Sequence, residues 1–135
     1  MKITDYIIAE DIRTETGNKF SIMGIYCEEV RLNFPDNIQW PVPYRFGVYI
    51  RLKIEDSDEF PNRFVLKVDH NNNTVAQIDG NIEFIESMHT ISLPFVIQPF
   101  PLPGFGTLRF NFEIYKDENL LSSGIHELNI LSKNS

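Results

Sequence analysis

Apolar and polar residues alternate with a period of two along much of this chain. The clearest run is 46–54, in which every even-numbered residue is apolar, and 108–115 repeats it. Shorter runs of the same kind are 30–34, 64–68, 78–84 and 91–95. Successive side chains of a β-strand point to opposite faces, so each run predicts a strand with one buried and one wetted face. Antiparallel sheets packed on each other satisfy that pattern.

Turn-forming residues separate these runs at short intervals. Gly17-Asn18 follows the first run, the asparagines 71–73 lie between two later runs, and 116–119 joins the last two. Asparagine tolerates the left-handed backbone that tight hairpins require. Gly80, inside an alternating run, marks a bulge or a close approach of the backbone. We expect eight or nine strands within one domain spanning 1–135, and no helix of useful length.

Two proline-rich segments differ from hairpin connections. Residues 34–43 hold three prolines and the only tryptophan, and residues 98–106 hold three more prolines and two glycines. Proline has no backbone N–H to donate to a ladder. Both segments are therefore predicted to be extended connections, crossing between sheets or running along an edge. The acidic run 55–59 is predicted to be a third loop.

Composition agrees with this pattern. The chain has two alanines, against 17 isoleucines and 17 aromatic residues, and such side chains favour a pleated surface over a helix. A chain of 135 residues buries roughly two thirds of its unfolded surface and needs no metal or disulfide to fold. The predicted fold is all-β, a single antiparallel β-sandwich of immunoglobulin-like character.

The charge excludes several functions. The net charge is −7 and no two of the twelve basic residues are adjacent, so we expect no nucleic-acid partner and no docking on an anionic membrane. No apolar stretch approaches the ~20 residues that cross a bilayer. Acidic residues interrupt the apolar run within 1–15, unlike a secretory signal. A single cysteine fits a reducing compartment, and we expect a cytoplasmic protein.

Five segments form a recognisable set: 9–13 and 17–26 at the start of the chain, and 93–95, 102–106 and 110–119 near its end. Together these segments resemble a family of short bacterial proteins of unknown function. The five segments consist of turn and core positions. Members often carry a tyrosine shortly after the late glycine, where this chain has Leu108. The resemblance implies a compact β-sandwich and assigns no catalytic residue.

Residues capable of catalysis are scattered. His70, His89 and His126 match no paired-ligand motif for zinc, and Cys27 is followed by two glutamates, which do not favour a reactive thiolate. No nucleophile elbow or phosphate-binding glycine loop is present. We therefore expect no enzyme, no cofactor and no metal centre. An enzyme whose residues converge only in three dimensions is the weakest hypothesis.

A basic stripe is the first candidate interaction surface. Tyr49, Arg51 and Lys53 lie on the polar side of the run 46–54, and Arg45 extends the same outward face of the strand. Arginine and tyrosine are frequent in interface hot spots. The alternative is a solvated strand whose cations pair with Glu113 or Glu127 across the sheet.

Aromatic residues on the proline-rich segments are the second candidate. They are Trp40, Tyr44, Phe100 and Phe105. Exposed aromatic rings on such segments form a protein-docking patch or a platform for a sugar ring, or else they are lids over the ends of the core. Our first hypothesis is a non-catalytic protein-interaction module that uses these aromatics or the basic stripe.

The acidic loop supports a second hypothesis, a small-ligand or calcium-dependent binding domain. Asp56 and Asp58 in the loop 55–59, with Asp69 or Asp117, supply the oxygen ligands that calcium takes, although the run lacks the glycine of an EF-hand loop. An exposed edge strand is also able to pair two copies into a homodimer.

Overall fold

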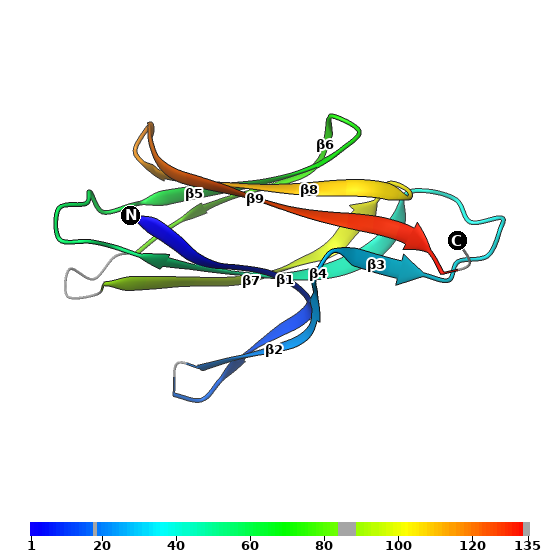
Figure 1. The fold of residues 1–135 in the computed structure, drawn as a ribbon, viewed down its shortest axis with the longest axis horizontal. Helices are drawn as coiled ribbons and strands as arrows, with labels where there is room; N and C mark the ends of the chain where they lie inside the picture. The colour runs from blue at the N-terminus through cyan, green and yellow to red at the C-terminus, as the bar shows by residue number, and fades with distance from the viewer. Residues whose placement is uncertain (18, 84–88, 134–135) are drawn as a thin grey trace.

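Nine strands form two sheets in the computed structural model, which describes residues 1–17, 19–83 and 89–133. The strands are β1 (Lys2–Glu15), β2 (Lys19–Tyr26), β3 (Glu29–Leu32), β4 (Val42–Lys53), β5 (Arg63–His70), β6 (Asn73–Asn81), β7 (Thr90–Leu102), β8 (Gly106–Lys116) and β9 (Asn119–Ser132). Sheet A has the order β2-β1-β4-β7, and sheet B has the order β3-β9-β8-β5-β6. The sheets lie one above the other (Figure 1). Across the described ranges no helix is long and apolar enough to cross a membrane.

The core lies between the two sheets and confirms the predicted faces. The apolar side chains of β4 and β8 that alternate in sequence are fully buried: Phe46, Val48, Ile50 and Leu52 on β4, and Leu108, Phe110, Phe112 and Ile114 on β8. The rings of Phe46 and Phe110 meet across the sandwich with centroids 5.5 Å apart. Burying each such side chain contributes about 1.5–3 kcal/mol, so the alternation itself specifies which face packs inward.

The predicted turn chemistry is confirmed as well. Asn71 and Asn72 have φ angles of 51° and 67°, the left-handed values that a tight hairpin between β5 and β6 requires. Gly80 is a close approach rather than a bulge. A Cβ atom there would lie 2.3 Å from Cε1 of Phe64, and the only register shift between β5 and β6 lies elsewhere, at Val68/Asp69.

One strand pair differs from the antiparallel prediction. β3 runs parallel to β9, with Val30 opposite Ile130. After Tyr26 the chain leaves sheet A and joins the edge of sheet B, where the direction of β3 matches that of the last strand. A period of two reports only which face is buried, so the orientation of a four-residue strand depends on a neighbour far away in the sequence.

The second proline-rich segment belongs largely to a strand. Residues up to Leu102 continue β7, which is an edge strand of sheet A and tolerates prolines for that reason. The interpretation of Phe100 as a surface aromatic is wrong, because its side chain is fully buried and its ring packs on Phe46 at 5.1 Å. Pro99 and Pro101 take the exposed positions of the alternation, so Phe100 points inward.

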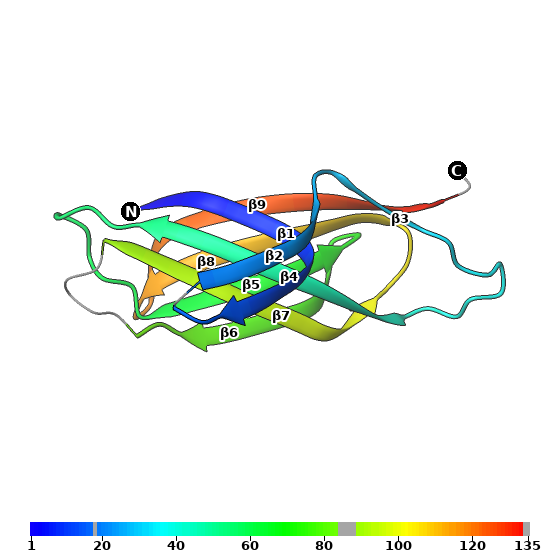
Figure 2. The same cartoon turned by 90° about the horizontal axis from the view of Figure 1, so that it is seen from below.

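The β1–β2 hairpin departs from sheet A. The pairing of β1 with β4 ends at Ala9 opposite Gly47, and the rest of β1 pairs with β2 alone. Figure 1 shows this hairpin projecting from sheet A on the side away from sheet B, and in Figure 2 it crosses β4. A Cβ atom on Gly47 would lie 2.9 Å from Cγ1 of Ile12, so this glycine lets the hairpin approach closely. The divergence leaves a fork between the hairpin and β4, which we call the strand fork.

At one side of the sandwich a tyrosine and a histidine pack between β1 and the strands of sheet B. The Tyr6 hydroxyl donates a hydrogen bond of 2.8 Å to the backbone carbonyl of Phe110, and the His126 ring lies 5.6 Å from the Tyr6 ring. Nε2 of His126 is buried and has no hydrogen-bond partner in the described part of the chain. Burial lowers the pKa of His126 below its usual value of 6.5, although a hydrogen bond with the Tyr6 backbone acts in the opposite direction.

We expect His126 to make the fold less stable in mild acid. Because the folded state disfavours the protonated ring, the unfolded chain binds more protons between the lowered pKa and pH 6.5. The free energy of unfolding should therefore fall as pH drops through that window, by at most about 1.4 kcal/mol per pH unit for one proton. Urea unfolding between pH 5 and pH 8 measures this slope. His126→Leu should flatten it, and an equal slope in this variant would contradict the assignment.

Candidate functional site

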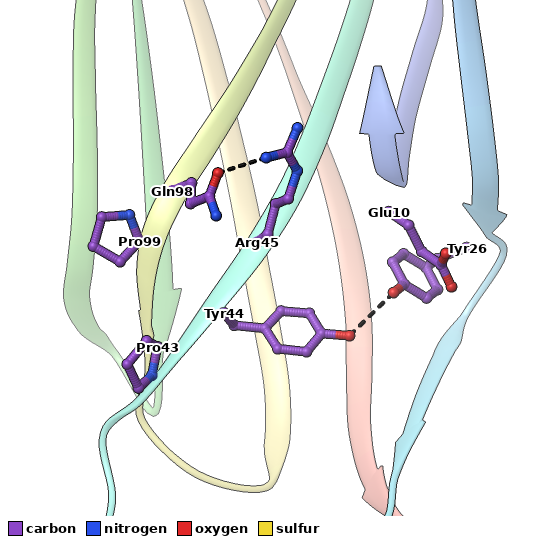
Figure 3. Close-up of a pocket in the computed structure, with 7 residues that line it drawn as sticks. All are labelled: Glu10, Tyr26, Pro43, Tyr44, Arg45, Gln98 and Pro99. Carbon is purple, nitrogen blue, oxygen red and sulfur yellow. Dashed lines mark hydrogen bonds between the residues drawn. The ribbon is translucent and has the colours of Figure 1, made fainter. Parts of the chain in front are cut away.

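A hollow of about 440 Å³ lies in the strand fork, and we call it the fork pocket (Figure 3). Its lining comes from four strands: Glu10 of β1, Tyr26 at the end of β2, Pro43, Tyr44 and Arg45 of β4, and Gln98 and Pro99 of β7. The hollow exists because the hairpin turns away from β4 after Ala9, so nothing pairs with this part of β4 on that side. Volumes of about 300–1,000 Å³ are typical of ligand sites.

Two tyrosines line the pocket beside the core. The hydroxyls of Tyr26 and Tyr44 lie 3.1 Å apart and share a hydrogen bond, drawn in Figure 3. Both rings pack on Phe46, with centroid distances of 6.2 Å and 5.0 Å. Burial raises the pKa of Tyr26, and so do the hydrogen bond with Tyr44 and the negative charge of Glu10. The Tyr26 hydroxyl therefore keeps its proton at neutral pH in a fixed position.

A bridged arginine forms another wall. Nη1 of Arg45 donates to Oε1 of Gln98 at 2.5 Å, and Nη2 pairs with the carboxylate of Asp11 on β1. The Arg45 guanidinium, and after it Arg13, lowers the pKa of Asp11 below its usual range. The Asp11–Arg45 pair thus ties the hairpin to β4 above the pocket. The amide nitrogen of Gln98 has no hydrogen-bond partner among the described residues and remains able to donate.

Glu10 supplies the uncompensated charge of the pocket. Its carboxylate has neither an ion-pair nor a hydrogen-bond partner within residues 1–17, 19–83 and 89–133. Gly24 lies across from it on β2 with a φ of 67°, and a Cβ atom there would lie 2.6 Å from Cδ of Glu10. The glycine therefore provides the space that Glu10 occupies. The fork pocket thus combines a free acceptor, free donors and apolar proline walls.

A second hollow of about 290 Å³ adjoins the first, and we call it the end pocket. Trp40, Pro41, Val75, Pro101 and Pro103 line it. Pro101 is the cross-strand partner of Pro43, which lines the fork pocket, so paired residues of β4 and β7 line the two hollows. The Trp40 ring packs edge to face on Phe105 at 5.1 Å, and Phe105 is 42% exposed. Trp40 also packs against the core, which fits the interpretation of a lid.

The basic stripe is largely occupied by contacts within the chain. Nε of Arg51 lies 2.6 Å from the Asp5 carboxylate, the Tyr49 hydroxyl lies 3.1 Å from Oγ of Ser92, and Nζ of Lys53 lies 3.9 Å from Glu55. Within the stripe only Arg45 lines either of these two pockets.

The prediction that the cations of the stripe pair with Glu113 or Glu127 is wrong. Both belong to sheet B, whereas the stripe lies on sheet A, where β1 supplies Asp5 and Asp11 as partners. Pairing across a sheet requires neighbouring strands, and the identity of the neighbour of β4 is a property of the fold.

The acidic loop 55–59 has its own internal contacts. Asp58 pairs with the Met1 amine at 2.5 Å and accepts the Glu55 backbone N–H at 2.8 Å, and the Met1 amine lowers the Asp58 pKa. Asp117 lies at the same end of the sandwich, where it accepts from Asn62, whereas Asp69 lies at the opposite end of β5. In the ranges described, no three His, Cys, Asp or Glu side chains group as metal ligands would. Calcium binding stays a prediction.

Sequence reasoning missed Glu10, Tyr26 and Gln98 as site residues. Each lies on a different strand, and no motif or local spacing joins them. Gly24 is the one local signal, since a glycine inside a strand marks a close approach, and the structure places Glu10 against it. Of the residues predicted to bind, Tyr44 and Arg45 line the fork pocket and Trp40 lines the end pocket.

Comparison with protein-family models and with curated sequences gives no match. The resemblance of its opening and closing segments to a family of short bacterial proteins therefore stays a prediction, and the function has to be argued from the pockets themselves.

Proposed function

We propose that this protein is a non-catalytic binding module that holds an extended segment of a protein partner across the fork pocket and the end pocket. The proposal rests on the closeness of the two hollows. Pro43 lines the fork pocket and Pro101 lines the end pocket, and the two residues are paired across β4 and β7. An extended chain crossing this pair would place one side chain in each hollow.

The surface is suited to such a segment because it is preformed. Prolines line both hollows, and their fixed φ leaves little conformational freedom to lose when a partner binds. Side chains two apart on an extended segment project to the same side about 7 Å apart, a spacing that suits adjoining hollows. Glu10 and the Gln98 amide offer an acceptor and donors, which give direction and specificity to an otherwise apolar contact.

The chemistry of the fork pocket favours binding over catalysis. A general acid or base works best with a pKa near the operating pH, and the raised pKa of Tyr26 lies far from neutrality. The hydroxyl of Tyr26 is therefore a hydrogen-bonding group rather than a proton carrier.

A single cysteine, Cys27, is exposed and free, which supports a role in a reducing compartment such as the cytoplasm.

The order of strands supports an immunoglobulin-like topology for the module. In immunoglobulin domains the strands A, B and E lie in one sheet and G, F and C in the other, with C′ added beside C in variable-type domains. Here β1, β4 and β7 follow each other in sheet A, and β9, β8, β5 and β6 follow each other in sheet B. The β1–β2 hairpin and β3 are additions to that order, and the hairpin creates the fork pocket.

Selection of random peptides displayed on phage, followed by calorimetry with the enriched synthetic peptide, tests the proposal. Phe105→Ala removes an exposed ring that packs on Trp40 of the end pocket, and Glu10→Ala removes an exposed carboxylate of the fork pocket. Each should weaken peptide binding by about tenfold, since an exposed contact of this kind is worth about 1.4 kcal/mol.

Ile125→Ala is the matched control. Ile125 is 52% exposed and lies on sheet B, far from both pockets, so its truncation should leave the affinity unchanged. Failure to enrich any peptide, or an enriched peptide that binds both variants as tightly as the wild type, would overturn the proposal.

A further inference from the structure

Each sheet leaves two strand edges open, and three of the four are protected. On β7, Pro94, Pro99 and Pro101 remove backbone donors. β3 is four residues long and carries Glu29 and Arg31. β6 exposes only polar side chains in its nine residues: Asn73, Thr74, Gln77, Asp79 and Asn81. Short strands, prolines and polar or charged side chains are the usual ways of preventing edge-to-edge pairing.

The edge of β2 lacks these protections. It is eight residues long, it contains no proline, and Lys19 at its first position is its one charged residue. Met23 and Ile25 on its outward face are 40% and 57% exposed. In the described part of the chain β2 pairs only with β1, so a row of backbone donors and acceptors faces outward beside exposed apolar side chains.

We propose that the edge of β2 pairs with β2 of a second copy of this chain, in an antiparallel arrangement with Met23 on the two-fold axis. A two-fold axis normal to the sheet keeps each side chain on its own face, so residues of the same parity lie opposite each other. The dimer would join sheet A of both copies into one continuous sheet.

The register centred on Met23 follows from side-chain complementarity. It places Phe20 opposite Tyr26 of the second copy, so that two aromatic side chains face each other across the pair. Lys19 then lies at the end of the strand, near the acidic Glu28-Glu29 segment of the second copy. Centring the axis on Ile22 instead would set Lys19 against the apolar Ile25, which is less favourable.

The interface is small, so the dimer is weak. In this register residues 20–26 of each copy pair, and such a short strand pair buries less than the standard interface of about 1,600 Å². Each copy also carries a net charge of −7. Raising the salt concentration screens the repulsion between copies and should strengthen association. This dimer does not depend on the partner segment proposed for the two pockets.

Sedimentation equilibrium between about 10 µM and about 1 mM tests the dimer. The wild type should shift from monomer toward dimer as its concentration rises. Met23→Lys sets two ammonium groups opposite each other on the axis and should weaken the dimer by at least about tenfold. Ile125→Lys, on the exposed face of sheet B, should leave it unchanged. A wild type that stays monomeric throughout overturns the proposal, and so does a dimer that both variants weaken equally.

Oxidative cross-linking tests the register. In a Cys27→Ser background, Met23→Cys places two thiols opposite each other within disulfide reach and should yield a covalent dimer. Ile25→Cys is the matched control, since its two copies would be about 14 Å apart in this register. Efficient cross-linking of Ile25→Cys instead of Met23→Cys would exclude the Met23-centred arrangement.

Discussion

Phe100→Ala should lower the free energy of unfolding by about 3–5 kcal/mol, whereas Phe105→Ala should lower it by less than about 1 kcal/mol. The two residues lie five apart on the same proline-rich segment, yet Phe100 is fully buried and Phe105 is 42% exposed. The Phe100 ring packs edge to face on Phe46 at 5.1 Å, so truncation opens a cavity in the centre of the core. Phe105 touches Trp40 and leaves no cavity when truncated.

Urea unfolding of both variants measures this difference. A domain of this size has a stability of about 5–15 kcal/mol, so a loss of about 3–5 kcal/mol unfolds Phe100→Ala only if the wild type lies at the low end of that range. Phe100→Leu keeps most of the buried volume and gives a folded variant with a smaller loss, which separates a cavity effect from a failure to fold. Equal losses for Phe100→Ala and Phe105→Ala would mean that the segment does not enter the core as a strand.

Gly80→Ala should lower the free energy of unfolding by about 1–3 kcal/mol through overpacking. The new Cβ atom would lie 2.3 Å from Cε1 and 2.4 Å from Cζ of Phe64, far inside van der Waals contact. The Phe64 ring has little room to retreat, because it stacks on Phe95 at 5.6 Å and lies 6.0 Å from Phe112. Without that contact, replacing a strand glycine with alanine would stabilise the fold slightly by restricting the unfolded chain.

A double-mutant cycle identifies the cause. In a Phe64→Leu background the shorter side chain leaves space for the new methyl group, so the penalty of Gly80→Ala should largely disappear. Asn81→Ala, at the next and exposed position of β6, should change stability by no more than about 0.5 kcal/mol. An unchanged penalty in the Phe64→Leu background would show that the glycine is required for its backbone and not for the space above it.

Both proposals depend on the β1–β2 hairpin, and on different parts of it. Its root supplies Glu10 and Tyr26 to the fork pocket, and its outer edge supplies Met23 and Ile25 to the dimer. The Asp11–Arg45 pair and the contact of Ile12 with Gly47 hold the hairpin near sheet A. Met23→Lys therefore tests the edge without altering the lining of the pocket, whereas Glu10→Ala removes a pocket side chain that also covers Gly24 of β2.

The candidate site was predictable only in part. The basic stripe predicts Arg45 as a binding residue, and the proline-rich segment predicts Trp40. Both residues line pockets. Phe100 was selected by the same reasoning and is buried, because prolines on an edge strand do not prevent the residues between them from entering the core. Phe100 and Leu102 alternate with Pro99 and Pro101 in the sequence, and this period of two predicts that Phe100 and Leu102 share a buried face.

Local sequence is enough to predict the all-β class, the buried faces of β4 and β8 and the left-handed turn at Asn71-Asn72, because each depends on residues close together in the chain. Which strands are neighbours is known only from the folded chain. That order of strands pairs Arg51 with Asp5, makes β3 parallel to β9, and brings Glu10 and Gln98 to one pocket. The physical reason is that strand pairing joins residues distant in sequence, and an alternating pattern specifies a face to bury without specifying the strand beside it.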